Sequence, residues 1–161
     1  MDRLWAPWRM EYIAGEQRPG CLFCRVIEHP DDPDAELVAW RPQGAIVMLN
    51  KFPYNPGHSM VAPIAHKASL EDLDDAETTE LMRAVRRTIG VLNKTMTPDG
   101  LNAGVNIGRA AGAGIPDHVH FHIVPRWNGD TNFMAVIDDV KIVNEALGQT
   151  AEKLKRAFAA T

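Results

Sequence analysis

Three of the six histidines stand at alternate positions, His118, His120 and His122, and this spacing constrains the fold more than any other feature of the chain. Successive side chains in a strand point to opposite faces, so a strand would carry these rings on one face and the apolar residues between them on the other. The intervening residues are β-branched or aromatic, which favours a strand. Pro125 cannot donate to a central ladder, which predicts that this buried strand ends just after the third histidine.

A row of imidazoles has a limited set of uses. Neighbouring rings discourage one another's protonation, and a neutral imidazole can act as nucleophile, general base or metal ligand. Two alternatives to a catalytic row are histidines that only hydrogen-bond within a core and a metal site formed by all three rings. Strict alternation opposite an apolar face favours a catalytic row.

Length, charge and cysteine content narrow the class of protein. The chain has 161 residues, 45% of them hydrophobic, which suits one domain with its own core. A net charge of −4 indicates no nucleic-acid partner. Because no apolar run is long enough to span a membrane and the start lacks a signal-peptide core, we expect a cytoplasmic protein without a membrane partner. Cys21 and Cys24, the two cysteines, form a C-x-x-C pair that indicates metal or redox chemistry in a reducing compartment.

The remaining pattern predicts an α+β domain, with an antiparallel sheet of about five strands, a central helix and a C-terminal helix. Short apolar runs predict strands at 36–40, 45–49 and 59–62, joined as antiparallel neighbours, and residues 29–34 are expected to form an exposed turn. Asp74 and Glu77 form a capping-box pattern at the start of the central helix. We expect one domain over 1–161, divided into an aromatic arm (1–20), a core (21–127) and a C-terminal part (128–161) with a strand at 132–137 and a helix from Lys141.

A second strand, 101–108, alternates apolar residues with small polar ones. If it pairs with 118–124 as a hairpin, its glycines make room beside the histidines and Asn106 offers an amide there. The glycine-rich loop that follows, 108–116, allows backbone N–H groups to approach an anion closely. Beside three histidines, this loop indicates a phosphate site.

The segment His118-Val119-His120-Phe121-His122-Ile123-Val124 matches the signature of the histidine triad superfamily, which the sequence resembles from about Cys21 to Arg126. Further matches are Asn50, Pro56-Gly57-His58, Asn106 and Gly108. The flanking segments 4–12, 125–127 and 129–133 are most similar to the bacterial diadenosine tetraphosphate phosphorylase branch, which is related to the fragile histidine triad hydrolases.

The resemblance implies catalysis by four histidines. His120 would attack the α-phosphorus of a dinucleoside polyphosphate and form a nucleotidyl-histidine, which water or phosphate then resolves. His122 would donate to the phosphate oxygens, His118 would complete the triad, and His58 would orient it. No divalent cation is required at the nucleophile, although the polyphosphate can arrive bound to Mg²⁺.

Substrate-binding positions follow from the same resemblance. Asn50 would contact the ribose, and Asn106 together with the amides of the loop would stabilise charge on the phosphate oxygens. The loop glycines concerned are Gly108, Gly112 and Gly114. Many family members have a serine or glutamine where this chain has Gly114.

The family also implies a structural zinc ion, held by Cys21, Cys24, His66 and His118, with free thiols as the alternative. If zinc holds His118, that ring fixes the strand and cannot serve as an acid. By analogy with the family the chain is expected to form a homodimer or a higher homo-oligomer.

Two other functions remain open from the sequence. One is an adenosine phosphoramidase, which would release AMP from a phosphoramidate and leave the tetraphosphate untouched. The other is a nucleotide- or zinc-binding module without turnover.

Overall fold

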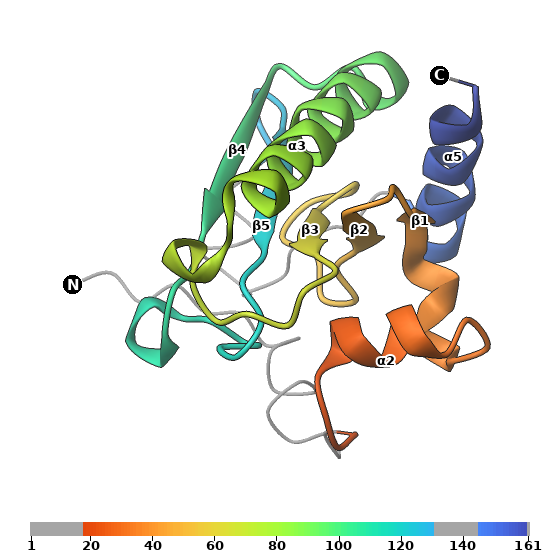
Figure 1. Ribbon diagram of the computed structural model, residues 1–161. Coiled ribbons are helices and arrows are strands. Elements are labelled where there is room, and N and C mark those ends of the chain that lie inside the picture. Colours follow the sequence, from red (N-terminus) through yellow and green to blue (C-terminus); the bar gives the residue numbers. More distant parts are fainter. Residues whose placement is uncertain (1–17, 131–144, 161) are drawn as a thin grey trace.

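The computed structural model describes residues 18–130 and 145–160 and confirms an α+β fold (Figure 1). None of the helices in this part of the chain is long and apolar enough to cross a bilayer. The elements, in chain order, are α2 (Leu22–Glu28), η1 (Pro33–Leu37), β1 (Val38–Trp40), β2 (Ala45–Leu49), β3 (Ser59–Pro63), η2 (Leu70–Asp72), α3 (Asp75–Met96), β4 (Gly100–Val105), η3 (Arg109–Ala111), β5 (Phe121–Arg126) and α5 (Leu147–Ala159).

The five strands form one antiparallel sheet, as expected from the sequence, and the structure gives their order as β1-β2-β3-β5-β4. The hairpin between β4 and β5 is also confirmed, and Gly104 lies directly opposite His122. Residues opposite each other in antiparallel strands share a face. The register therefore places one row of side chains across the sheet, formed by Met48, Met60, His122 and Gly104. The adjacent row, which faces the other side, is Val47, Val61, Phe121 and Val105.

Helix α3 lies across one face of the sheet and packs on β2, β3 and β5 (Figure 1). Its start follows the predicted capping box: the Glu77 N–H donates to Asp74 Oδ1 at 2.8 Å, and the Asp74 N–H donates to Glu77 Oε2 at 2.9 Å. Leu81 and Leu92 are fully buried, and each contributes about 1.5–3 kcal/mol through burial. The helix ends at Met96, and the C-cap residue Thr97 has a left-handed backbone with a φ of 46°.

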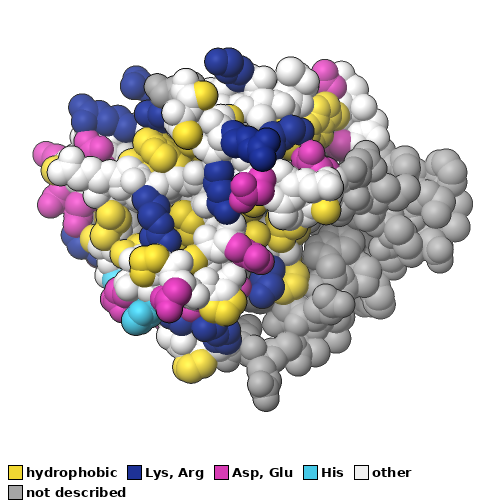
Figure 2. All heavy atoms as spheres, turned by 90° about the vertical axis from the view of Figure 1, so that its right-hand side faces the viewer, with side chains coloured by type: hydrophobic (Ala, Val, Ile, Leu, Met, Phe, Trp, Pro, Cys, Tyr) yellow, Lys and Arg dark blue, Asp and Glu magenta, His cyan; other side chains and the backbone are white. Residues whose placement is uncertain are grey.

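Helix α5 packs on β1, which is one of the two edge strands of the sheet. The rings of Trp40 and Phe158 stack with centroids 5.2 Å apart, and the Arg87 guanidinium lies 4.4 Å from the Trp40 centroid. A helix packed on an edge strand in this way disfavours its pairing with another chain. On the face of the molecule that Figure 2 shows, Lys and Arg side chains lie among Asp and Glu side chains.

The turn at residues 29–34 is not uniformly exposed as expected, and the strand predicted at 36–40 begins only at Val38. Asp32 is buried, and its Oδ1 accepts from the Asp34 N–H at 2.8 Å. Pro33 occupies the first turn of η1, a position where its missing N–H costs nothing. The capped turn therefore continues as a short helix where the apolar pattern predicted a strand.

The triad also departs from the prediction of one continuous strand. Regular pairing of β5 begins at Phe121, so His118 and His120 precede it, and β5 continues through Pro125 to Arg126. The Arg126 carbonyl accepts from the Asp99 N–H on the β4 side, so Pro125 faces the side of β3. Since β3 pairs with β5 only as far as Ile123, the proline removes no ladder bond there.

Several predictions fall outside the described residues. These are the arm as far as residue 17, the strand at 132–137 and the start of the last helix at 141–144. Within the described part, that helix begins at Leu147, which confirms an amphipathic helix near the C-terminus.

Candidate active site

A cavity of about 860 Å³ opens on the face of the sheet away from α3. The side chains of Met48, Met60 and His122, from the row across the sheet, line it. None of the α3 residues does. Of the residues predicted to bind or turn over substrate, six line this cavity: Asn50, Asn106, Gly112, Gly114, His120 and His122.

His120 is held in one tautomer. Its side chain is buried, and Nδ1 lies 2.8 Å from the His118 carbonyl oxygen. A carbonyl only accepts, so Nδ1 carries the proton and the lone pair is on Nε2. Burial lowers the pKa of His120, although the bond to His118 acts in the opposite direction. The Phe23 ring packs 5.1 Å from the His120 ring. The result is a neutral, oriented imidazole with a nucleophilic nitrogen.

His122 receives its orientation from His58. The Tyr54 N–H donates to His58 Nδ1 at 3.1 Å, which leaves the His58 proton on Nε2. That Nε2–H then donates to His122 Nδ1 at 3.0 Å. His122 must therefore carry its own proton on Nε2, as a hydrogen-bond donor. Its ring centroid lies 4.8 Å from that of His120, so a donor and a nucleophile stand side by side.

The loop between β2 and β3 places His58 and Asn50 at adjoining strand ends. The Asn50 N–H donates to the His58 carbonyl at 2.9 Å, and Asn50 Oδ1 accepts from the Phe52 N–H at 2.9 Å. Gly57 has a φ of +78°, which an L side chain rarely adopts. A Cβ there would also lie 2.4 Å from Met96 Sδ. The tight turn just before the buried His58 therefore requires glycine.

The loop between β4 and the triad folds as a single turn of 3-10 helix, η3, between two glycines. Gly108 has a φ of +80° and Gly112 a φ of +87°. Gly112 and Gly114 line the cavity, whereas Gly108 is not among the lining residues. A glycine-rich turn beside two histidines suits an anion that approaches the backbone closely.

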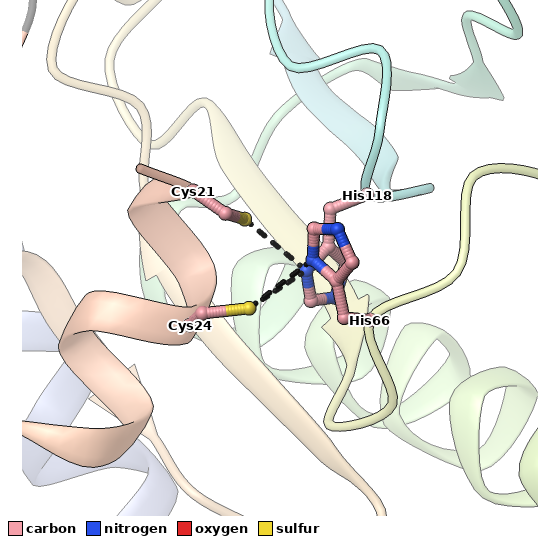
Figure 3. Close-up of side chains that lie close together, drawn as sticks. All are labelled: Cys21, Cys24, His66 and His118. Carbon is pink, nitrogen blue, oxygen red and sulfur yellow. Dashed lines mark hydrogen bonds between the residues drawn. The ribbon is translucent and has the colours of Figure 1, made fainter. Parts of the chain in front are cut away.

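At the border of the cavity, which Cys21 and His66 also line, Cys21, Cys24, His66 and His118 face one another, as Figure 3 shows. One ligand atom from each lies within 4.8 Å of all the others. Cys21 Sγ lies 3.3 Å and Cys24 Sγ 3.7 Å from His118 Nδ1, and Cys24 Sγ lies 3.2 Å from His66 Nδ1. Ligands about 2.0–2.3 Å from a tetrahedral zinc ion are roughly 3.5 Å apart, so the four residues could hold such an ion.

The protonation of these four side chains bears on whether they can bind a metal ion. His118 Nε2 lies 2.8 Å from the Pro63 carbonyl, so its proton is on Nε2 and its Nδ1 lone pair faces the cysteines. Burial lowers the pKa of His118. Burial and the neighbouring Cys21 raise the pKa of Cys24 to about 11, so a cation is needed to keep it as a thiolate.

Helix α2 explains why the two cysteines converge. Cys21 is its N-cap residue, and Cys24 lies three positions further, on the same side of the helix. His66 comes from the segment after β3, and His118 comes from the segment before β5. Figure 3 shows the two thiols on α2 directed at the two rings.

The sequence interpretation missed several parts of the site. Phe23, inside the C-x-x-C pair, packs on both His118 and His120. Tyr54 acts on His58 through its backbone N–H, which no side-chain pattern reveals. A group of ion pairs also borders the cavity, and in it Asp32 and Asp34 pair with three cations. The sequence signal that could have indicated this charged group is Lys51, the residue after Asn50. The three cations are Arg18, Arg25 and Lys51.

The chain is similar in sequence and in structure to the following proteins. It is 36% identical to a protein named AP-4-A phosphorylase from Mycobacterium tuberculosis, over 99% of this chain and 85% of that one. It is 31% identical to a protein named adenosine 5'-monophosphoramidase hnt1 from Schizosaccharomyces pombe, over 67% of this chain and 75% of that one. The crystal structure of a zinc-bound histidine triad family protein from Mycobacterium smegmatis superposes with a TM-score of 0.68 at 27% identity, covering 88% of this chain and 94% of that chain.

The model of the HIT domain family matches residues 35–129, more than half of the chain. This range holds the strands β1 to β5, helix α3 and the histidine row. Together with the identity to relatives along nearly the whole chain, the match shows that this chain belongs to the HIT domain family.

Proposed function

We propose that this protein is an enzyme that transfers a nucleotidyl group from a dinucleoside polyphosphate, of the diadenosine tetraphosphate type, to phosphate or water. The observation that carries the proposal is the His120 ring, neutral and buried, with its lone pair on Nε2 beside the donor His122. The similarity to the protein named AP-4-A phosphorylase supports the substrate class.

The reaction proceeds by two displacements. His120 Nε2 attacks the α-phosphorus, the P–N bond forms, and the P–O bond to the leaving nucleotide breaks. The His122 Nε2–H and the Asn106 amide donate to the phosphoryl oxygens as charge accumulates on them, together with N–H groups of the loop that holds Gly108, Gly112 and Gly114. The acceptor then attacks the same phosphorus and releases His120.

The other predicted residues have supporting roles. His58 is a positioning residue that selects the tautomer of His122. Asn50 contacts the ribose. Cys21, Cys24, His66 and His118 hold a structural zinc ion, whose chemistry is to fix the backbone around the triad and not to take part in the transfer. Mg²⁺, where present, accompanies the polyphosphate.

Incubation with diadenosine tetraphosphate tests the proposal. ADP and ATP formed only with phosphate indicate a phosphorylase, and AMP and ATP formed without it indicate a hydrolase. The His120→Ala variant should lose turnover and keep nucleotide binding. A wild-type protein that binds AMP but never forms the nucleotidyl-histidine would refute the enzyme and leave the binding module.

A second candidate is a phosphoramidase, which the similarity to the protein named adenosine 5'-monophosphoramidase favours. It predicts AMP from adenosine phosphoramidate and an intact tetraphosphate. Assaying both substrates with one preparation separates the two activities.

We also propose that the protein is a cytoplasmic homodimer. Cys21 and Cys24 form no disulfide, which suits a reducing compartment. Strand β4 is an edge strand with mostly exposed residues, and such an edge can pair with a second copy. Light scattering of the eluting protein measures the mass that decides between monomer and dimer.

A further inference from the structure

Among the residues that the structure describes, four basic side chains line the cavity: Arg18, Arg25, Lys51 and Arg109. Three of them are already paired with carboxylates. Arg18 Nη1 lies 2.9 Å from Asp32 Oδ1, and Arg25 Nη2 lies 2.9 Å and Lys51 Nζ 3.2 Å from the oxygens of Asp34. Each of these three side chains therefore already has a carboxylate partner.

Arg109 differs from these three. It is exposed and is the first residue of η3, on the loop whose Gly112 and Gly114 also line the cavity. Within residues 18–130 and 145–160, no carboxylate or other hydrogen-bond partner of its guanidinium is found. The cavity thus contains a cation that is available to a ligand, on the same loop as the proposed phosphate contacts.

The two displacements require an anion in the same place twice. In the first step the leaving polyphosphate departs from the side of phosphorus opposite His120 Nε2, because the entering and leaving groups are in line. In the second step the acceptor also enters opposite the P–N bond that breaks. The acceptor therefore occupies the position that the leaving group vacated.

We infer that Arg109 is a specificity-determining residue, which binds the leaving polyphosphate in the first step and the inorganic phosphate acceptor in the second. The inference rests on the proposed function. For diadenosine tetraphosphate the first step releases ATP, and attack by a phosphate oxygen on the nucleotidyl-histidine forms ADP, frees His120 and releases one proton to solvent. A guanidinium forms paired, charge-assisted hydrogen bonds with a phosphate, whereas a water acceptor gains nothing from it.

The test compares wild type with Arg109→Ala and Arg109→Lys over a range of phosphate concentrations and measures the ratio of ADP to AMP. Loss of the charge-assisted bonds should raise the phosphate concentration needed for half-maximal ADP formation about 10- to 100-fold in R109A. AMP then replaces ADP as the main product, and the lysine variant should lie between. The ratio is independent of how much active protein each preparation contains.

Two further variants serve as comparisons. Arg86 is exposed on α3 and does not line the cavity, so Arg86→Ala removes the same charge and should leave the ratio unchanged. Lys51→Ala tests the competing cation. An unchanged ratio in R109A, or an equal shift in K51A, overturns the inference.

A binding arm separates this inference from the proposed function. In a His120→Ala background, titration with ATP measures the affinity for the leaving nucleotide without turnover. Adding Arg109→Ala should weaken this binding about tenfold or more at low salt, whereas adding Arg86→Ala should not. Absent turnover in wild type refutes the proposed function, while equal ATP affinity with and without Arg109 refutes only the role of Arg109.

Discussion

The replacement of His58 by phenylalanine isolates the hydrogen bonds that orient His122. A phenyl ring retains the shape of the imidazole and its stacking on Tyr54, where the centroids are 5.0 Å apart and the planes are tilted by 15°. It removes both ring nitrogens. The Tyr54 N–H loses its acceptor at 3.1 Å, and His122 Nδ1 loses its donor at 3.0 Å.

The expected cost follows from these two bonds. A buried group that loses its partner costs about 1–3 kcal/mol, but Tyr54 and His122 are only half-buried and line the cavity, where water can replace the lost bonds. H58F should therefore lose about 1–3 kcal/mol of stability in total, less the gain from a more apolar ring. The His122 proton is then no longer fixed on Nε2. Since loss of one transition-state donor costs about 10²–10³-fold and His122 still adopts the correct tautomer part of the time, we expect a rate about 10- to 100-fold lower.

Urea unfolding and single-turnover formation of the nucleotidyl-histidine measure the two effects. Leu81→Ala is the matched control, because it removes a buried side chain of α3, costs about 2–5 kcal/mol and leaves the cavity intact. At a temperature where both variants are folded, only H58F should react slowly. An equal rate in H58F and L81A would show that His58 does not orient His122.

Three further predictions concern the scaffold. Gly57→Ala should cost about 2–5 kcal/mol of unfolding free energy in urea, from a left-handed backbone and the Met96 contact, whereas Gly90→Ala, with no atom within 4 Å of the new Cβ, should not destabilise. Removal of bound zinc by a chelator should lower the melting temperature by roughly 2–4 °C per kcal/mol lost and slow nucleotidyl transfer, and a chain that binds no zinc in elemental analysis contradicts the metal site. The hydrogen bond from Arg18 lowers the pKa of Asp32 from 3.8 to about 2, so stability present above pH 3.8 should be lost as the pH falls towards 2, and in Asp32→Asn unfolding curves should show a weaker pH dependence in that interval.

Much of the site could be predicted because its residues are close in sequence or carry a periodic signal. His118, His120 and His122 are two residues apart, and the hairpin that places Gly104 beside His122 follows from two alternating segments. The capping box at Asp74 is likewise local. The two cysteines are 42 to 97 residues from the two histidine ligands, so only the family resemblance connected the pairs.

What could not be predicted depends on tertiary contacts. Asp32 stands in a run of turn residues, yet it is buried because Arg18 and Arg25 reach it from 14 and 7 residues away. Pro125 is tolerated within β5 because β3 begins only at Ser59, opposite Ile123, which cannot be read from either segment alone. Helix α2 has only seven residues, and burial of Phe23 and Val26 favours it more than propensity does.

His118 belongs both to the metal site and to the catalytic site. Its ring faces the cysteines and the Pro63 carbonyl, and its own carbonyl holds the His120 ring. The peptide unit after His118 therefore links the metal site to the His120 ring and sets the direction of its reactive nitrogen. A displacement of the cysteine-bearing helix would be transmitted over a few covalent bonds, so oxidation of the cysteines or metal exchange there would change the direction of the His120 ring without any reaction at His120 itself.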